Sequence, residues 1–119
     1  QARVVVGGWR PGQGRRAGGI GSLLVGVRDE AGGADGGGLR YVGKVGTGFT
    51  DAELDRLLTV LEPLRSEANP FTTPVPPAEA KVAIWVAPSL EAEVTFDSWT
   101  PDGKLRAARW QTPTRREGH

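Results

Sequence analysis

Residues 39–49, LRYVGKVGTGF, run directly into residues 50–58, TDAELDRLL, and this junction decides the fold. Apolar and polar side chains alternate through the first stretch with the two-residue period of a β-strand. The second stretch begins at Thr50 and has Glu53 three residues later, a capping box that satisfies two backbone N–H groups at the start of a helix. The junction therefore predicts a strand that passes into a helix. On the strand we expect one face to carry Leu39, Tyr41, Gly43 and Val45, and the other to carry Arg40, Val42, Lys44 and Gly46.

The helix is predicted to span about residues 50–62, with ends uncertain by a few residues. Pro63 should end or kink it, because proline lacks a backbone N–H and crowds the preceding turn. Four leucines recur at helical spacing and form one apolar stripe: Leu54, Leu57, Leu58 and Leu61.

Two strands are predicted before the junction and two or three after the helix. Residues 4–6 form a short buried strand, residues 10–19 a Gly- and Pro-rich loop, and residues 20–29 an alternating strand. After the helix, residues 66–80 are predicted to be an extended Pro-rich connector. Later strand signals lie at residues 82–86, 90–97 and 104–110.

This order is that of an OB-fold, a five-stranded Greek-key β-barrel with its helix between strands three and four. The chain is therefore predicted to be all-β with one helix. It forms a single domain over residues 1–119, a length that can bury a core without disulfides or metals. We expect the leucine stripe to plug one end of the barrel. An SH3-like barrel is the nearest alternative, but it rarely carries a long capped helix at this point.

Composition excludes several classes of site. The chain has no cysteine, and its one histidine, His119, is the last residue, so we expect no catalytic triad and no metal site. No apolar run approaches the roughly 18 residues that a membrane span requires, and no signal peptide is visible. These features predict a cytoplasmic protein without a membrane partner.

Positive charge is concentrated at the two ends of the sequence. Residues 1–28 carry five arginines and residues 103–116 carry five basic residues, and neither segment has an acidic residue. Segregated charge can create a basic face on a protein whose net charge is only +1. Arginines on a glycine-rich loop favour contact with phosphate, because glycine allows close approach and arginine donates a forked pair of hydrogen bonds. The predicted DNA contacts are Arg10, Arg15, Arg16 and Lys44, with Arg106 and Arg109 from the last strand as weaker choices. The alternative for each of them is a role in solubility alone, because an exposed basic residue needs no ligand.

Two weaker signals are better explained by structure than by ligand binding. Residues 12–17, GQGRRA, match the dinucleotide-binding pattern G-x-G-x-x-A, but the glycines that follow do not start the helix that this site requires. Tryptophans can stack on bases. Trp9 and Trp110, however, lie at predicted strand ends, where packing that closes a barrel explains them at least as well.

Taken together, six segments resemble the C-terminal OB domain of bacterial ATP-dependent DNA ligases, especially those of the ligase D type. The resemblance covers almost the whole chain, in the order VVVGGWRPGQGRR, IGSLLVGV, LRYVGKVGTGF, TDAELDRLL, IWVAPSLEAEVTF and SWTPDGKLR. It implies a part in sealing nicks in double-stranded DNA during repair and end joining. It also implies ATP and Mg²⁺ as cofactors of the intact ligase, and an upstream nucleotidyltransferase domain as partner, with other end-joining domains or proteins as further partners.

The resemblance further implies that this chain carries no catalytic residue and binds no cofactor alone. In the family, the lysine that becomes adenylylated lies upstream in a Lys-x-Asp-Gly motif, which this chain lacks. The family motif that follows the last strand and contacts the ATP pyrophosphate is replaced by QTPTRREGH at residues 111–119, where Arg115 and Arg116 are the only candidates for that contact. The alternatives are a freestanding, non-enzymatic nucleic-acid-binding module and a protein-interaction barrel.

Overall fold

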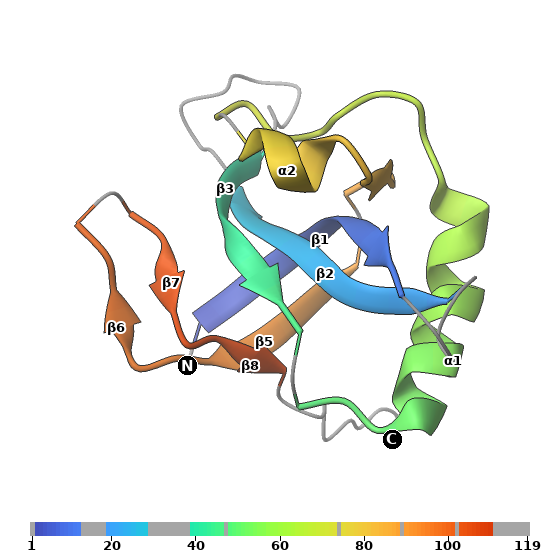
Figure 1. The fold of residues 1–119 in the computed structure, drawn as a ribbon, viewed down its shortest axis with the longest axis horizontal. Coiled ribbons are helices and arrows are strands. Elements are labelled where there is room, and N and C mark those ends of the chain that lie inside the picture. Colours follow the sequence, from blue (N-terminus) through green and yellow to red (C-terminus); the bar gives the residue numbers. More distant parts are fainter. Residues whose placement is uncertain are drawn as a thin grey trace.

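The computed structural model describes residues 2–12, 19–28, 39–46, 48–73, 75–88, 90–101 and 103–110. Its elements are β1 (Ala2–Pro11), β2 (Ile20–Arg28), β3 (Leu39–Val45), α1 (Asp51–Leu61), a 3₁₀ helix (Glu62–Leu64), α2 (Pro77–Ala80), β4 (Ile84–Trp85), β5 (Glu91–Thr95), β6 (Ser98–Trp99), β7 (Leu105–Arg106) and β8 (Arg109–Trp110) (Figure 1).

The fold is mostly β, as predicted, with the one long helix between β3 and β4. Six antiparallel strands form one sheet in the order β3-β2-β1-β5-β8, with β4 paired to the second half of β1, and β6 and β7 form a separate hairpin. Among the described residues, no ladder joins β3 to β8 at the two ends of this order. The predicted strand over residues 104–110 is broken into β7 and β8, because Ala107 adopts a φ of 59° between them.

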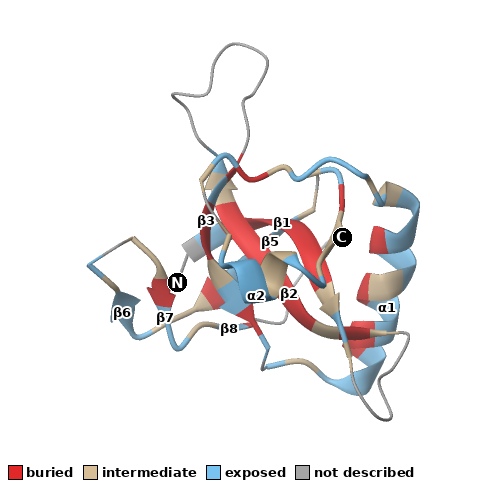
Figure 2. Cartoon of the chain, turned by 45° about the horizontal axis from the view of Figure 1, so that its top comes forward, coloured by how far each residue is buried: buried red, intermediate tan, exposed pale blue. Residues whose placement is uncertain are grey.

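The sheet has a buried core on each face, so β1 is covered on both sides (Figure 2). Val4, Val6 and Trp9 enter the larger core, whereas Val5 enters a smaller core on the opposite face. The helix α1 covers the larger core and contributes Leu54, Leu57 and Leu61, so its predicted apolar stripe is confirmed. The smaller core consists of Val5, Leu24, Leu39, Tyr41 and Phe71.

The helix α1 begins as the sequence predicts. The Glu53 backbone N–H donates to Thr50 Oγ1 at 3.1 Å, and the Thr50 N–H donates to Glu53 Oε1 at 3.2 Å, which completes the capping box. The α-helix ends at Leu61, and Pro63 lies in the 3₁₀ turn that follows. Proline tolerates this tighter turn, but it cannot donate the hydrogen bond that would continue an α-helix.

Register shifts at Gly7 and Val42 change which side chains share a face, and a further shift lies where Arg10 and Pro11 pair with β2. In β1, Val6 pairs with Val25 and Gly8 pairs with Leu24, so Gly7 is an extra residue and the faces are exchanged beyond it. In β3 the register shifts in the same way at Val42. The predicted single face of Leu39, Tyr41, Gly43 and Val45 is therefore wrong: Leu39 and Tyr41 enter the smaller core, and Val42 and Val45 enter the larger one.

The connector after α1 packs against the sheet, and its last part is helical. Residues 77–80, predicted as part of an extended segment over 66–80, form α2. Phe71 is buried and lies on the backbone of two glycines. A Cβ atom added to Gly7 would come 2.5 Å from Phe71 Cζ, and one added to Gly26 would come 2.9 Å from Phe71 Cε1. The Leu39 N–H donates to the Pro70 carbonyl at 2.9 Å, and the Thr72 N–H donates to the Leu39 carbonyl at 2.7 Å. The connector is thereby fixed over the smaller core.

Gly48 provides a test of how the loop before α1 is joined to β8. Its φ is +93°, and a Cβ there would lie 2.5 Å from the Trp110 carbonyl oxygen and 2.8 Å from the Trp110 nitrogen. Gly48→Ala should therefore lower the free energy of unfolding by at least about 2 kcal/mol, because backbone strain and a backbone clash act together. Chemical denaturation measures this change.

Gly46→Ala is the matched control from the same loop. A Cβ there meets Ser22 Cβ at 3.6 Å, an ordinary van der Waals contact, and Gly46 has no positive φ. The free energy of unfolding should change by less than about 0.5 kcal/mol in this variant. Equal decreases in the two variants would show that Gly48 is not specially constrained.

Candidate nucleic-acid interface

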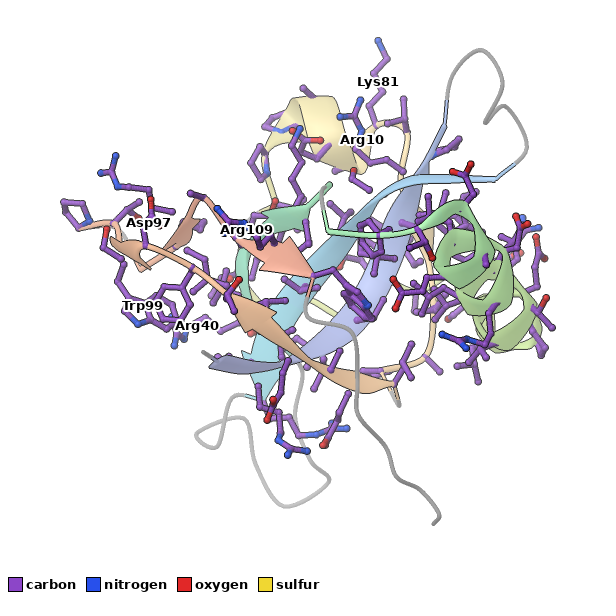
Figure 3. All side chains as sticks on the ribbon, turned by 90° about the horizontal axis from the view of Figure 1, so that it is seen from below. Arg10, Arg40, Lys81, Asp97, Trp99 and Arg109 are labelled. Carbon is purple, nitrogen blue, oxygen red and sulfur yellow. The ribbon has the colours of Figure 1, made fainter. Side chains whose placement is uncertain are left out.

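The ends of β1, β2 and β3 enclose an open groove with a cation on each side. Arg10 comes from β1 and Lys44 from β3. The bulge at Gly7 places Arg10 on the same side of β1 as Val5 and Gly8, the side that α2 covers (Figure 3). Lys44 pairs across the sheet with Leu24, which in turn pairs with Gly8, so Lys44 lies on that face too. The groove has a volume of about 440 Å³ and is lined by Arg10, Pro11, Gly12, Gly21, Ser22, Lys44 and Gly46.

A carboxylate on α2 joins the two cations. Glu79 Oε1 lies 3.0 Å from Arg10 Nη1, and Glu79 Oε2 lies 3.1 Å from Lys44 Nζ. The Glu79 side chain is only 15% exposed, compared with 31% for Arg10 and 44% for Lys44. The structure therefore brings together Arg10 and Lys44, two of the predicted DNA contacts, and gives them a shared counter-ion that the sequence pattern does not reveal.

Two polar atoms of these ion pairs, Arg10 Nε and Glu79 Oε1, are buried without a hydrogen-bond partner. Arg10 Nε is buried and has no hydrogen-bond acceptor. Glu79 Oε1 is buried and accepts no hydrogen bond of good geometry, although it lies at ion-pair distance from Arg10. A buried donor without an acceptor costs about 1–3 kcal/mol. The guanidinium of Arg10 can therefore gain from an additional acceptor.

Tyr41 belongs to the smaller core, and the charges of Glu79 and Arg10 affect the pKa of its hydroxyl. Burial raises the pKa of the Tyr41 hydroxyl from 10.0 to about 12, the Glu79 carboxylate adds to the rise, and the Arg10 guanidinium opposes it. The ring packs edge-on against Phe71, with centroids 5.3 Å apart, and Lys104 Nζ lies 5.9 Å from the ring centroid. Tyr41 is the only tyrosine in the chain.

The remaining predicted contacts lie elsewhere or outside the described residues. Arg106 in β7 and Arg109 in β8 are exposed. Within the described part of the chain, no ion pair or hydrogen bond links either of them to the groove. Arg106 belongs to the β6–β7 hairpin that carries Trp99, and Arg109 pairs with Thr95 of β5 (Figure 3). Four further predicted residues fall outside the described residues: Arg15, Arg16, Arg115 and Arg116.

Other arginines of the basic N-terminal segment are paired with acidic residues. Arg3 lies 3.2 Å from Glu91 and 3.7 Å from Glu93 on the adjoining strand β5. Arg28 donates to the Pro88 carbonyl at 2.8 Å and lies 4.0 Å from Glu91. Charge that is segregated along the sequence is thus partly neutralised in the fold. The Arg10–Lys44 groove is the candidate phosphate site because two cations border one open, glycine-lined surface there, although both are also paired with Glu79.

Two of the four tryptophans belong to the larger core. Trp9 and Trp110 are buried, and Trp110 stacks on Phe49 with ring centroids 5.2 Å apart. Packing therefore explains these two residues. Trp85 is half-buried against Phe71, whereas Trp99 is 45% exposed in the β6–β7 hairpin. Of the tryptophans considered for base stacking, Trp99 is the most accessible.

No group of His, Cys, Asp or Glu side chains in the described ranges is arranged to hold a metal ion. We therefore assign no metal ligand there. The helices of the described ranges include none with the length and apolar character to cross a membrane.

Sequence reasoning missed Glu79 because residues 66–80 were interpreted as extended. A signal for the helix was present. Pro77 occupies the first helical turn, where proline is favoured, and Glu79 follows it in the same turn, where an acidic residue is favoured. What could not be found from the pattern is the long-range packing that brings this short helix against Arg10 and Lys44.

Paired cations over a glycine-lined backbone, on a small β-domain, form the kind of surface that contacts nucleic-acid phosphates. Residues 16–117 match the family described as the ATP dependent DNA ligase C terminal region. The chain belongs to this family.

Its similar relatives include proteins named for non-homologous end joining. The multifunctional non-homologous end joining DNA repair protein LigD of Mycobacterium tuberculosis is 44% identical over 108 residues, 91% of this chain. The chain spans only 13% of that relative. A DNA ligase of Ignicoccus hospitalis is 44% identical over 91 residues, which make up 76% of this chain and 14% of that ligase.

Solved structures agree with this assignment. The crystal structure of the ligase domain of M. tuberculosis LigD superposes with a TM-score of 0.82 at 43% identity, and the match covers 92% of this chain and 33% of that one. A mycobacterial DNA ligase D complexed with ATP and MES gives a TM-score of 0.76 at 41% identity, with 96% of this chain and 35% of that one covered.

The raised pKa of Tyr41 predicts a loss of stability at high pH. Because the folded-state pKa lies above the unfolded value, the contribution is fully present below pH 10 and is lost as the pH rises towards 12. The loss should be at most about 3 kcal/mol in the free energy of unfolding, since each pKa unit corresponds to about 1.4 kcal/mol. Urea denaturation at a series of pH values measures it.

Tyr41→Phe separates this effect from other titrations at high pH. The variant has no tyrosine left to ionise in either state. Its free energy of unfolding should therefore fall less steeply than that of the wild type between pH 10 and 12. Parallel pH profiles would contradict the assignment.

Proposed function

We propose that this chain is the DNA-binding OB domain of an ATP-dependent DNA ligase that seals nicks in double-stranded DNA during end joining. We also infer that its antiparallel sheet closes into the barrel of that fold, with α1 at one end. The observation that carries the proposal is the Arg10–Lys44 groove in a chain that belongs to the ligase C-terminal family.

The chemistry of the groove suits a DNA backbone better than base edges. Arg10 can donate to phosphate oxygens, and Lys44 adds a second positive charge on the opposite wall. Gly12, Gly21 and Gly46 carry no side chain that would keep a backbone away. A nick-sealing enzyme must accept any sequence, so contacts to phosphates rather than to bases are what the function needs. Arg15, Arg16, Arg106 and Arg109 extend this surface in our proposal.

Catalysis is assigned to the upstream nucleotidyltransferase domain of the intact protein. Adenylylation there requires a lysine in a Lys-x-Asp-Gly motif, and none of the three lysines of this chain, Lys44, Lys81 and Lys104, lies in one. ATP and Mg²⁺ serve the intact ligase; the described residues offer no cluster suited to the metal. Arg115 and Arg116 remain the proposed contacts to the ATP pyrophosphate. Other end-joining domains or proteins are proposed as further partners.

DNA binding tests the groove. Arg10→Gln and Lys44→Gln should each weaken binding to a nicked duplex by a similar factor on unrelated sequences. Removing one cation from a phosphate should reduce the slope of log affinity against log salt by up to about 0.9. Fluorescence anisotropy at several salt concentrations measures both quantities.

Arg3→Gln is the matched control for these variants. It removes the same charge, but Arg3 lies near the other end of β1 from Arg10 and does not line the groove. Its slope should stay that of the wild type. If the Arg10 and Lys44 variants behave like Arg3→Gln, or if they change sequence preference, the proposed interface is wrong.

Because catalysis is assigned to the upstream nucleotidyltransferase domain, we expect that this chain alone forms no covalent adduct with AMP. After incubation with radiolabelled ATP and Mg²⁺, no label should remain on the denatured chain, because the nucleophilic lysine is missing. The intact ligase domain of a relative provides the positive control. A label retained on this chain would falsify the assignment of catalysis to an upstream domain.

A further inference from the structure

We infer that Glu79 holds Arg10 and Lys44 in a closed, partly neutralised state and so weakens the affinity of the groove for DNA phosphates. This inference rests on the proposed function, because it concerns how that groove is regulated. Glu79 is thus a residue that tunes DNA binding without itself being a DNA contact.

Glu79 forms ion pairs with Arg10 and Lys44 at the same time. Each of its carboxylate oxygens faces a different partner, Arg10 Nη1 at 3.0 Å and Lys44 Nζ at 3.1 Å. The three side chains carry a net charge of +1 rather than +2. A phosphate that enters the groove must therefore compete with a carboxylate already in place.

Burial makes Glu79 a strong competitor. Its side chain is 15% exposed, far less than the carboxylates of Glu91 and Glu93, which pair with Arg3 at 44% and 48% exposure. Water screens a pair less when it is less exposed. Glu79 lies on the short helix α2, which begins at Pro77. The Glu79 N–H donates to the Pro76 carbonyl at 2.9 Å, which fixes the start of this helix.

The ion pair between Arg10 and Glu79 leaves hydrogen-bonding groups unsatisfied, which favours replacement of the Glu79 carboxylate by a phosphate. Arg10 Nε has no acceptor, and the Arg10–Glu79 contact lacks good hydrogen-bond geometry. A DNA phosphate, like a carboxylate, has two charged oxygens that can accept from the guanidinium in a forked manner, and here it can also use the Arg10 Nε–H that Glu79 leaves without an acceptor. DNA can therefore displace Glu79, at a cost that lowers the observed affinity.

The test is Glu79→Gln, which removes the charge and keeps the shape. Its affinity for a nicked duplex should rise about fivefold near 0.1 M salt, and the salt slope should steepen by up to about 0.9, as one more counter-ion is released. Glu93→Gln is the matched control: it removes an arginine-paired carboxylate from β5 and should change neither quantity appreciably. Unchanged or weaker binding by Glu79→Gln would mean that Glu79 merely positions the cations, and would overturn the inference.

The same substitution in an Arg10→Gln/Lys44→Gln background shows whether Glu79 acts through the two cations. The slope should then be unaffected by Glu79→Gln, since no cation remains to be released. An equal steepening in both backgrounds would overturn the inference. If the Arg10→Gln/Lys44→Gln chain binds DNA as tightly as the wild type does, the proposed function fails instead, which is a distinguishable result.

Two measurements do not depend on DNA affinity. Glu79→Gln should lower the pKa of Tyr41, because the carboxylate contributes to its rise, and absorbance titration follows this single tyrosine. In the wild-type chain, added duplex should shift the Glu79 carboxyl carbon resonance more than that of Glu93. A Glu79 resonance unmoved at saturating DNA would contradict displacement, even if the variant did not fold.

Discussion

The contact between the Phe71 ring and the bare backbone of Gly7 and Gly26 is the constraint on which the rest of the structure depends. It occurs where β1 has its extra residue and where β2 faces the bulge of β3. A side chain at either glycine would lift the ring and, with it, the connector that is hydrogen-bonded to Leu39. This packing fixes the first part of the connector that leads to α2, the helix that carries the counter-ion of the groove.

Because β1 is buried on both faces, the molecule has two cores, and the two cores have different roles. The larger core, closed by α1, supplies apolar area and therefore most of the stability. The smaller core is built around aromatic rings, with Tyr41, Phe71 and Trp85 in edge contacts. This second core carries the charged groove at its margin, so a surface for binding is supported by packing that is separate from the main core.

Local signals in the sequence predicted the elements well, and long-range geometry was harder to predict. The capping box at Thr50 and Glu53, and the leucine stripe behind it, depend on neighbours within one or two turns, so the sequence alone located α1. The face of Tyr41 depends on a bulge at Val42, which no alternation pattern reveals. The glycines near Arg10 and Lys44 suggest both residues as phosphate contacts, but the sequence could not show that Glu79, thirty-five residues beyond Lys44, pairs with both of them.

The extra residue in β1 makes the length of that strand as important as its composition. Trp9 and Arg10 are adjacent in sequence, yet one enters the larger core and the other borders the groove, and the count of residues from Val6 decides which is which. Removing Gly7 would exchange their sides, burying a guanidinium and exposing an indole. Homologous strands should therefore vary in their side chains more readily than in their number of residues, and an insertion or deletion here would disrupt the core and the groove at once.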